Sequence, residues 1–238
     1  MLHAVPVLSG ATVQVIPHVT DLIKAWIQNV ATTPVDGSDA PPAVCLVEVG
    51  GTVGDIESVV FLEALRQLRG ELPPEDMAFF HVSLVPVVGS VGEQKTKPTQ
   101  HSVRELRSTG IAPDFLVTRS SEPVDSDTRA KLGHACQVPR DHVVCVPDVA
   151  SIFHVPLVLA DQRLPELLFE RLKLTPPHAQ RLTSWRVGAV ALVAHVARSC
   201  VSAWCALLRR RSQRVPTPST RLCASHLWES TASCTTRT

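Results

Sequence analysis

Short apolar runs alternate with segments of helical periodicity along most of the chain. Residues 43–49 form a nearly unbroken apolar run of strand length, and three more segments that are expected to be strands lie at residues 81–88, 115–119 and 142–146. Apolar residues at helical spacing connect them, over about 56–70, 99–108 and 126–136. Apolar runs of this length are typical of strands that are covered on both faces. Their alternation with helices predicts an α/β fold with a doubly wound, mostly parallel sheet.

The N-terminal part of the pattern predicts one more strand and one more helix. Residues 12–16 are expected to form a short buried strand. Thr20 is a residue type that caps helices, and the helix that it begins is expected to run to about Val30. Residues 33–42 are rich in Pro, Gly, Asp and Ser, so we expect a surface loop there.

The loops after the expected strands are the first place to look for a ligand site. In open parallel sheets, ligands bind beyond the carboxyl ends of the strands. These loops therefore share one edge of the sheet, and they comprise residues 49–57, 89–100, 119–126 and 147–152.

Composition excludes some classes of protein. The chain has 238 residues, and its 45% apolar content is sufficient for a continuous core. Lys and Arg number 23 against 22 Asp and Glu, and aromatic residues are only 4% of the chain, so no nucleic-acid partner is expected. The seven cysteines form no Cys-x-x-Cys pair, and the first residues carry no basic signal-peptide region, so the expected location is cytoplasmic.

The pattern changes character after about residue 174. Thr175–Pro177 is expected to be a linker, and residues 175–238 as a whole are expected to form a linker and a disordered tail. Within the tail, Val187–Leu208 is apolar but contains Arg198, whose charge makes membrane insertion costly. We therefore do not expect membrane attachment.

Glu48 is the one charged residue in the run 43–49. At the end of a buried strand, an ionised carboxylate needs a partner. Two interpretations stay open: a salt bridge with a neighbouring Lys or Arg, or coordination of Mg²⁺ beside a nucleotide phosphate.

Residues 50–57, Gly-Gly-Thr-Val-Gly-Asp-Ile-Glu, form a glycine-rich connection between a strand and a helix. Glycines let backbone N–H groups approach a ligand at the positive end of a helix. Asp55 and Glu57 would repel a phosphate there, but they suit an amino group or a ribose hydroxyl. Ordinary helix capping by these acids is the alternative.

Residues 92–100, Gly-Glu-Gln-Lys-Thr-Lys-Pro-Thr-Gln, place two lysines just before an expected helix. This arrangement suits a triphosphate, although a solvated basic loop is an equally good interpretation. No segment matches the phosphate-binding motif G-x-x-x-x-G-K-[ST], and no nucleophile motif is present, so no catalytic residue is assigned.

Three segments together resemble the synthetase (amidoligase) domain of CTP synthase. They are residues 47–58, residues 92–100 and the sequence Ser-Val-Arg-Glu-Leu-Arg at 102–107. The likeness extends from about Thr12 to about Leu174, so residues 1–174 are expected to be a partial synthetase domain. The resemblance implies a fold like that of P-loop NTPases and dethiobiotin synthetase.

The function that the resemblance implies is the ATP-dependent amination of UTP to CTP. ATP is the co-substrate, Mg²⁺ the cofactor, and ammonia comes from a glutaminase domain. Glu48 corresponds to a metal ligand, and Pro147, Asp148 and Val149 correspond to the segment that holds the ATP adenine. The positions that correspond to UTP and CTP contacts are Asp55, Ile56, Glu57, Lys95, Thr96, Lys97, Pro98, Thr99, Gln100 and Lys131.

The sequence also departs from the family. The family's first strand, its glycine-rich phosphate loop and its glutaminase domain have no counterpart here, so the sheet is expected to lack that strand. Two hypotheses follow: a CTP synthase homologue that carries the UTP/CTP part of the site, or a non-catalytic fragment that binds CTP or UTP or joins other subunits. The family's tetrameric assembly implies a homo-oligomer.

Overall fold

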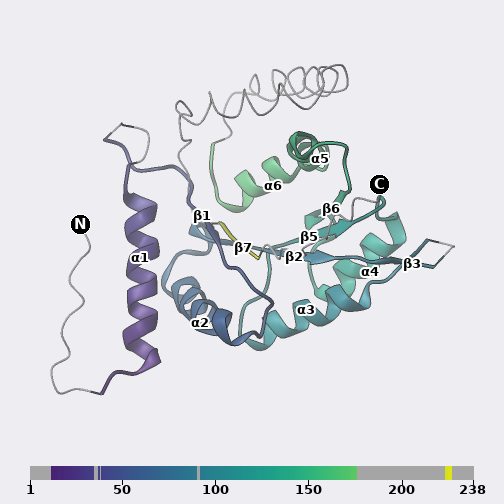
Figure 1. Cartoon of the computed structure of the whole chain (residues 1–238). Coiled ribbons are helices and arrows are strands. Elements are labelled where there is room, and N and C mark those ends of the chain that lie inside the picture. The colour runs from purple at the N-terminus through teal and green to yellow at the C-terminus, as the bar shows by residue number, and fades with distance from the viewer. Residues whose placement is uncertain (1–11, 35–36, 38, 90–91, 176–222, 227–238) are drawn as a thin grey trace, which may run out of the picture.

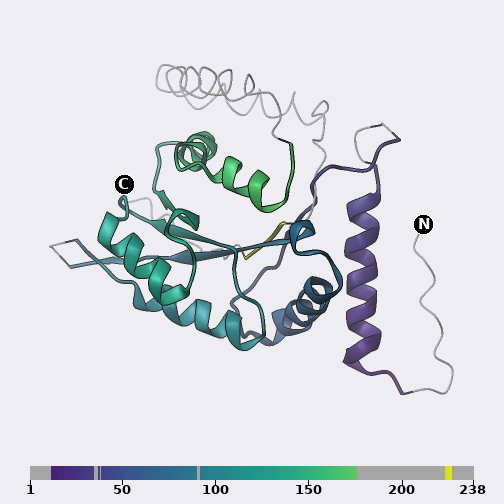
Figure 2. The same cartoon turned by 180° about the vertical axis from the view of Figure 1, so that it is seen from behind.

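The computed structural model describes residues 12–34, 37, 39–89, 92–175 and 223–226. These residues form an α/β fold in which helices cover both faces of a parallel sheet (Figure 1). Helices α5 and α6 lie on one face, and α2, α3 and α4 lie on the other, as the view from behind also shows (Figure 2). The predicted α/β class with a parallel sheet is therefore confirmed.

The elements follow one another in the order that the pattern predicts over residues 43–147. The strands of the main sheet are β1 (Leu46–Glu48), β2 (Ala78–Leu84), β5 (Phe115–Ser120), β6 (Val143–Pro147) and β7 (Cys223–His226). The helices are α1 (Thr20–Thr32), α2 (Ile56–Glu71), α3 (Lys97–Ser108), α4 (Ser126–Cys136), α5 (Val155–Asp161) and α6 (Leu164–Arg171). Strands β3 (Val87–Val88) and β4 (Glu93–Gln94) form a separate antiparallel hairpin, and 3₁₀ turns occupy Pro74–Asp76, Arg140–His142 and Ile152–His154.

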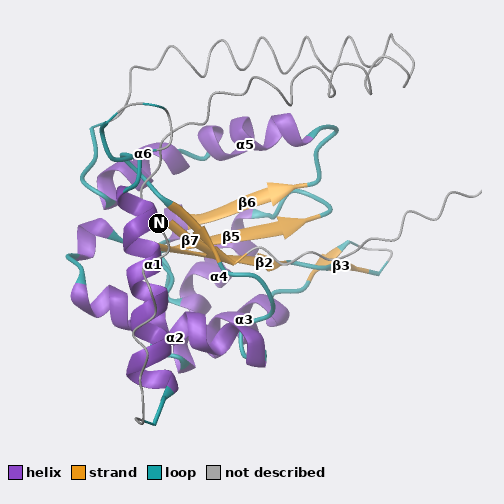
Figure 3. Cartoon of the chain, turned by 60° about the vertical axis from the view of Figure 1, so that its left-hand side comes forward, coloured by secondary structure: helices purple, strands orange, loops and turns teal. Residues whose placement is uncertain are grey.

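The strands of the main sheet lie in the order β1-β7-β2-β5-β6, and every neighbouring pair is parallel. Figure 3 shows β7, β2, β5 and β6 of this sheet. Their carboxyl ends therefore open onto one edge. Two backbone hydrogen bonds join the loops at this edge: Val85 N donates to Arg119 O at 2.7 Å, and Asp148 N donates to Ser120 O at 2.9 Å. The expectation of one shared edge is confirmed for β2, β5 and β6.

The predicted strand at residues 12–16 is wrong. Val15–Val19 form a π-helical turn that leads into α1, and the side chains of Val13 and Val15 are 62% and 56% exposed. A short strand needs a neighbour for its backbone hydrogen bonds, and none of the described strands lies beside this segment. Thr20 begins α1, but its hydroxyl donates to Pro17 O at 3.0 Å instead of capping the helix.

Strand β1 is covered on one face only, whereas the sequence predicted burial on both. Val47 packs against the core that α1 and α2 form with the sheet. Leu46 is 66% exposed, and Glu48 is also exposed. The cause is the position of β1 at the edge of the sheet.

Asp114, just before β5, links three parts of the fold. Its carboxylate accepts hydrogen bonds from Arg69 Nη1 of α2 at 2.7 Å, from Arg171 Nε of α6 at 2.9 Å and from Phe79 N of β2 at 2.8 Å. Burial of Asp114 opposes its ionisation, but the hydrogen bonds from Arg69 and Phe79 outweigh burial and lower the pKa of Asp114 below its usual value. The ionised carboxylate therefore ties helices on opposite faces of the sheet to the strands between them.

The expectation of a disordered tail does not hold for Cys223–His226. These residues form β7, which pairs with β1 on one side and with β2 on the other. The other residues of the predicted linker and tail, 176–222 and 227–238, lie outside the described residues, and so does the apolar run Val187–Leu208.

Candidate functional site

The glycine-rich turn after β1 is closed by its own hydrogen bonds. Gly51 and Gly54 have φ values of +85° and +99°, a region in which side chains are strained. Thr52 N donates to Asp55 Oδ2 at 3.2 Å, and Asp55 N donates to Thr52 O at 3.0 Å. The buried Ser58 hydroxyl lies 3.1 Å from Thr52 O and 3.0 Å from Asp55 O. The turn is thus held from inside by Ser58.

The three residues that follow Gly54 stand at the start of α2 with their side chains in solvent. Asp55 is the N-cap residue, but its side chain makes no hydrogen bond into the helix, because it accepts from Thr52 N instead. Ile56 is 90% exposed, and Glu57 is exposed. Capping by the Asp55 side chain is therefore not what holds these acids here, and the exposed side chains of Ile56 and Glu57 are accessible to a ligand.

Glu48 ends β1 immediately before this turn. Because Glu48 is exposed, the argument that a buried carboxylate needs a partner does not apply to it. Among the described residues there is no group of three or more His, Cys, Asp or Glu side chains that could hold a metal ion. In nucleotide sites, one or two carboxylates bind Mg²⁺ together with phosphate oxygens and water. The carboxylate of Glu48 suits Mg²⁺ only in a site of that kind.

The lysine-containing loop divides into exposed and buried residues. Lys97 and Pro98 are exposed, whereas Lys95 is partly buried, with a side chain that is 44% exposed and an Nζ that lies 2.5 Å from Glu93 Oε2. No ion pair of Lys97 is found among the described residues. The lysines are therefore the residues of this loop that face a possible anion.

Thr96 and Thr99 are buried, so the structure gives them a different place from the lysines. The Thr99 side chain is fully buried, its hydroxyl donates to Leu84 O at 3.1 Å, and it accepts from Ser83 Oγ at 3.1 Å. Thr96 Oγ1 accepts from Gln100 Nε2 at 3.0 Å. The Thr99 hydroxyl therefore fixes the first turn of α3 to the end of β2, and the Thr96 hydroxyl bonds within that turn, so both help to position Lys97.

Gln94 joins the same loop to the start of α4. Its amide nitrogen donates to Pro123 O at 2.8 Å, and its amide oxygen accepts from Asp125 N at 3.1 Å. Asp125 in turn caps α4 through Thr128 N at 2.7 Å. Lys131 is exposed on α4, so this chain of hydrogen bonds connects the helix that carries Lys131 with the lysine-containing loop.

The segment Pro147–Val149 follows β6 at the same edge of the sheet. Asp148 is exposed, and its Oδ1 lies 3.9 Å from Arg119 Nη2 at the end of β5. Pro147 and Val149 are partly buried. The segment therefore lies beside the carboxyl end of β5, and strands β2 and β7 separate β5 from the strand that leads into the glycine-rich turn.

Two cavities border the turn. The smaller one, of about 260 Å³, lies between Gly51–Val53, the end of β2 at Val82–Leu84, and Pro98 with Ser102 of α3. His81 also lines it, and its Nε2 lies 2.9 Å from Ser102 Oγ. This cavity brings the glycine-rich turn and the start of the lysine-bearing helix together.

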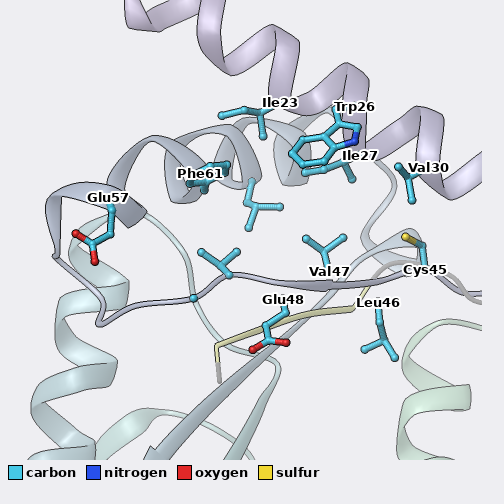
Figure 4. Close-up of a pocket in the computed structure, with 13 residues that line it drawn as sticks. Ile23, Trp26, Ile27, Val30, Cys45, Leu46, Val47, Glu48, Glu57 and Phe61 are labelled. Carbon is cyan, nitrogen blue, oxygen red and sulfur yellow. The ribbon is translucent and has the colours of Figure 1, made fainter. Parts of the chain in front are cut away.

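The larger cavity, of about 500 Å³, is mainly apolar (Figure 4). Ile23 and Trp26 of α1 lie above it, Phe61 of α2 closes one side, and Val47 points into it from β1, while Leu46 and Glu48 point to the opposite side of the strand. Trp26 is 65% exposed. The apolar lining gives this cavity little to offer a phosphate.

Comparison with known proteins identifies the family. The family model described as "CTP synthase N-terminus" matches residues 7–174. The chain belongs to the CTP synthase family. CTP synthase from Dictyostelium discoideum is 53% identical over 167 residues, which cover 70% of this chain and 29% of that protein. Human CTP synthase 1 is 48% identical over 179 residues, covering 74% of this chain and 30% of that protein.

CTP synthase from Drosophila melanogaster is similar to the same extent, with 48% identity over 180 residues that cover 74% of this chain and 28% of that protein. The chain thus spans less than a third of the length of these curated CTP synthases. The family resemblance that the sequence motifs indicated is confirmed.

The structure gives a role to two residues of the matching segments that the sequence alone did not single out. Ser58 and Ser102 belong to the matching segments, but the sequence gave no reason to single them out. Their hydrogen bonds to Thr52 O and to His81 show that they hold the turn and the lining of the smaller cavity. Their polarity inside otherwise apolar helical faces was the available signal. Within the described part of the chain, no helix has the length and apolarity needed to cross a membrane.

Proposed function

We propose that residues 1–174 are part of a CTP synthase synthetase domain and bind the pyrimidine nucleotide of the reaction that aminates UTP to CTP. The observation that carries the proposal is the smaller cavity, which lies between the glycine-rich turn and the first turn of α3. A cleft at the carboxyl edge of a parallel sheet is where such folds bind ligands.

The acids at the start of α2 suit the base and the ribose, and Glu57 lines the larger cavity. Asp55 and Glu57 accept hydrogen bonds, which CTP can donate from its 4-amino group and both nucleotides can donate from ribose hydroxyls. Ile56, which is 90% exposed, offers an apolar surface to the pyrimidine ring. A carboxylate beside the 4-position favours the amino group of CTP over the carbonyl oxygen of UTP, because two acceptors repel each other.

The basic side suits the triphosphate. Lys95, Lys97 and Lys131 are the cations of the motif, and each has its side chain at least partly in solvent. Thr96, Pro98, Thr99 and Gln100 form the turn that presents the lysines. In this proposal the buried hydroxyls of Thr96 and Thr99 position the cations, and the lysines make the contact with phosphate oxygens.

ATP and Mg²⁺ complete the proposed chemistry. Pro147, Asp148 and Val149 would border the adenine of ATP, and Glu48 would offer its carboxylate to Mg²⁺, which neutralises phosphate charge when it is bound. Ammonia would come from a glutaminase domain outside this sequence, the assembly would be a tetramer, and the location would be cytoplasmic. The P-loop NTPase-like version of the α/β fold is part of the same proposal.

A second candidate is nucleotide binding without synthesis, by a fragment that binds CTP or UTP or joins other subunits. The observation that favours it is the absence of a G-x-x-x-x-G-K-[ST] motif from the sequence, because such a loop cradles the phosphates of ATP during phosphoryl transfer. Incubation with UTP, ATP, Mg²⁺ and ammonia distinguishes the two candidates. Formation of CTP supports the enzyme, and binding of UTP without turnover supports the second candidate.

The base-recognition part of the proposal is tested with Glu57→Gln. The amide keeps the size of the side chain but loses the charge, so the preference for CTP over UTP should fall by about tenfold. Glu63→Gln is the matched control, because Glu63 lies on the same helix but pairs with Arg66. An unchanged ratio of the CTP and UTP dissociation constants in Glu57→Gln would show that Glu57 does not face the base.

A further inference from the structure

We propose that strand β7 is a working part of the candidate nucleotide site: Cys223–His226 hold β1 in place and keep open the cavity between the glycine-rich turn and β2. The nucleotide part of this inference rests on the proposed function, whereas the structural part does not. Sequence motifs gave no indication of it, because β7 lies far along the chain from the residues that match the family.

The pairing of β7 is continuous on both sides. Leu46, Val47 and Glu48 of β1 lie opposite Cys223, Ala224 and Ser225. On the other side, Ala78, Phe79, Phe80 and His81 of β2 lie opposite Cys223, Ala224, Ser225 and His226. Among the described residues, β1 has no other strand neighbour. The backbone hydrogen bonds of β1 to the sheet are therefore bonds to β7.

Strand β1 has few other restraints. It is only three residues long, and one of its faces packs on the core beneath α1 and α2 while Leu46 on the other face is 66% exposed. A strand of this length depends on its neighbour for stability. Glu48 is the last residue of β1 and the glycine-rich turn follows directly, so β7 fixes the position of both.

The end of β7 also determines where the smaller cavity begins. Strand β7 ends opposite His81, but β2 continues through Val82, Ser83 and Leu84. Strands in a sheet lie about 4.8 Å apart, so β7 keeps β1 and β2 about 9.6 Å apart. The cavity of about 260 Å³ lies beyond the part of β2 that pairs with β7, between Gly51–Val53 and Val82–Leu84.

The geometry therefore assigns β7 the role of a spacer. Without it, β1 could approach β2 or detach from the sheet, and in either case the cavity would lose its shape.

The first experiment is hydrogen–deuterium exchange of the full chain and of Ala224→Pro. Proline in the centre of an inner strand removes a ladder hydrogen bond and is not tolerated there. We expect peptides covering Leu46–Glu48 and Ala78–His81 to exchange at least tenfold faster in the variant, while peptides covering β5 and β6 keep their protection. Ser219→Pro is the matched control, because position 219 lies outside β7 and directly follows an existing proline, Pro218. Unchanged protection of β1 in Ala224→Pro would overturn the inference.

The second experiment tests the pairing without disturbing the strand. Leu46→Cys is combined with Cys45→Ala, so that the new thiol lies opposite the native Cys223. Neighbouring Cα atoms at about 4.8 Å are within the range that a disulfide spans, and the exposure of Leu46 makes the substitution tolerable. Mild oxidation should link residues 46 and 223. Val88→Cys, at a half-exposed position in the hairpin, is the control. A link at 46 no more frequent than at 88 would overturn the pairing, even if Ala224→Pro fails to fold.

The third measurement connects β7 to the ligand. If the full chain binds CTP, Ala224→Pro should bind it at least tenfold more weakly, and Ser219→Pro should bind it as the full chain does. Equal affinity in Ala224→Pro, together with lost protection of β1, would overturn the spacer role. If the full chain itself does not bind CTP, the proposed function fails, and the exchange and cross-linking results still decide whether β7 holds β1.

Discussion

Asp114→Ala should be among the most destabilising single substitutions in this chain. The Asp114 side chain is 12% exposed and accepts hydrogen bonds from two arginines and from Phe79 N. Loss of one partner of a buried ion pair costs about 3–5 kcal/mol. Arg69 and Arg171 are 33% and 19% exposed, so water can partly replace the carboxylate, and the lower end, about 3 kcal/mol, is expected.

The assay is urea unfolding of the wild-type chain and of the variant, with circular dichroism as the signal that monitors unfolding. The control is Glu63→Gln, which disrupts the exposed pair with Arg66 on the surface of α2 and should cost no more than about 0.5 kcal/mol. A loss smaller than about 1 kcal/mol in Asp114→Ala would refute the reasoning, because it would mean that the carboxylate does not link the two helical layers.

The same group gives stability a dependence on pH whose sign follows from its pKa. The pKa of Asp114 is lower in the folded chain than its usual value of about 3.9. Its contribution is therefore fully present above about pH 4 and is lost as the pH falls through the lower folded value. Stability of Asp114→Asn should fall less steeply below pH 4 than stability of the wild type. Parallel curves for the two proteins would contradict this assignment.

Three further predictions concern the candidate site. Lys97→Ala should weaken CTP binding about tenfold, as measured by calorimetry, because a charge-assisted contact with phosphate is lost. Lys173→Ala is the control and should leave binding unchanged, because Lys173 pairs with Glu75. Equal effects of the two substitutions would contradict the assignment of Lys97 to the phosphate. Thr99→Val should cost about 1–2 kcal/mol in urea unfolding, because Leu84 O loses its donor; a neutral result would show that the hydroxyl does not hold α3. Gly51→Ala should cost about 1 kcal/mol because of the φ value of +85°, and unchanged stability would show that the turn relaxes.

The parts of the fold that the sequence predicts well are those whose pattern is set locally. Helix α3 was expected at about 99–108 and spans Lys97–Ser108, and α4 was expected and found at 126–136. Helix α3 is followed by Gly110, and α4 begins at the cap residue Asp125, so local signals mark an end of each helix. The alternation of these helices with β5 and β6 was enough to predict the parallel sheet.

The features that the sequence did not predict depend on distant parts of the chain. The exposure of Leu46 follows from the edge position of β1, which no residue near Leu46 encodes. Strand β7 has the sequence Cys-Ala-Ser-His, which carries no strand pattern, and it is a strand because a place between β1 and β2 is open to it. Residues 12–16 show the converse, because their strand-like pattern has no neighbouring strand to pair with among the described residues.

In the candidate site, too, the sequence predicted some features and not others. The motifs identified the turn and the lysine-containing loop, and both border one cavity. The sequence could not tell that Thr99 is buried while Lys97 is exposed, because both are polar residues of one short segment. Nor could it tell that Glu48 is exposed, because its apolar neighbours indicated a buried strand.

Calorimetric titration of the full chain with CTP and, separately, with CMP tests whether the smaller cavity binds a pyrimidine nucleoside triphosphate. We predict saturable binding of CTP, at least tenfold tighter than binding of CMP, because in the proposed site Lys95 and Lys97 would contact the β- and γ-phosphates that CMP lacks. This difference should shrink in Lys97→Ala. Absence of saturable CTP binding, or equal affinity for CTP and CMP, would contradict the assignment of this cavity to a pyrimidine nucleoside triphosphate.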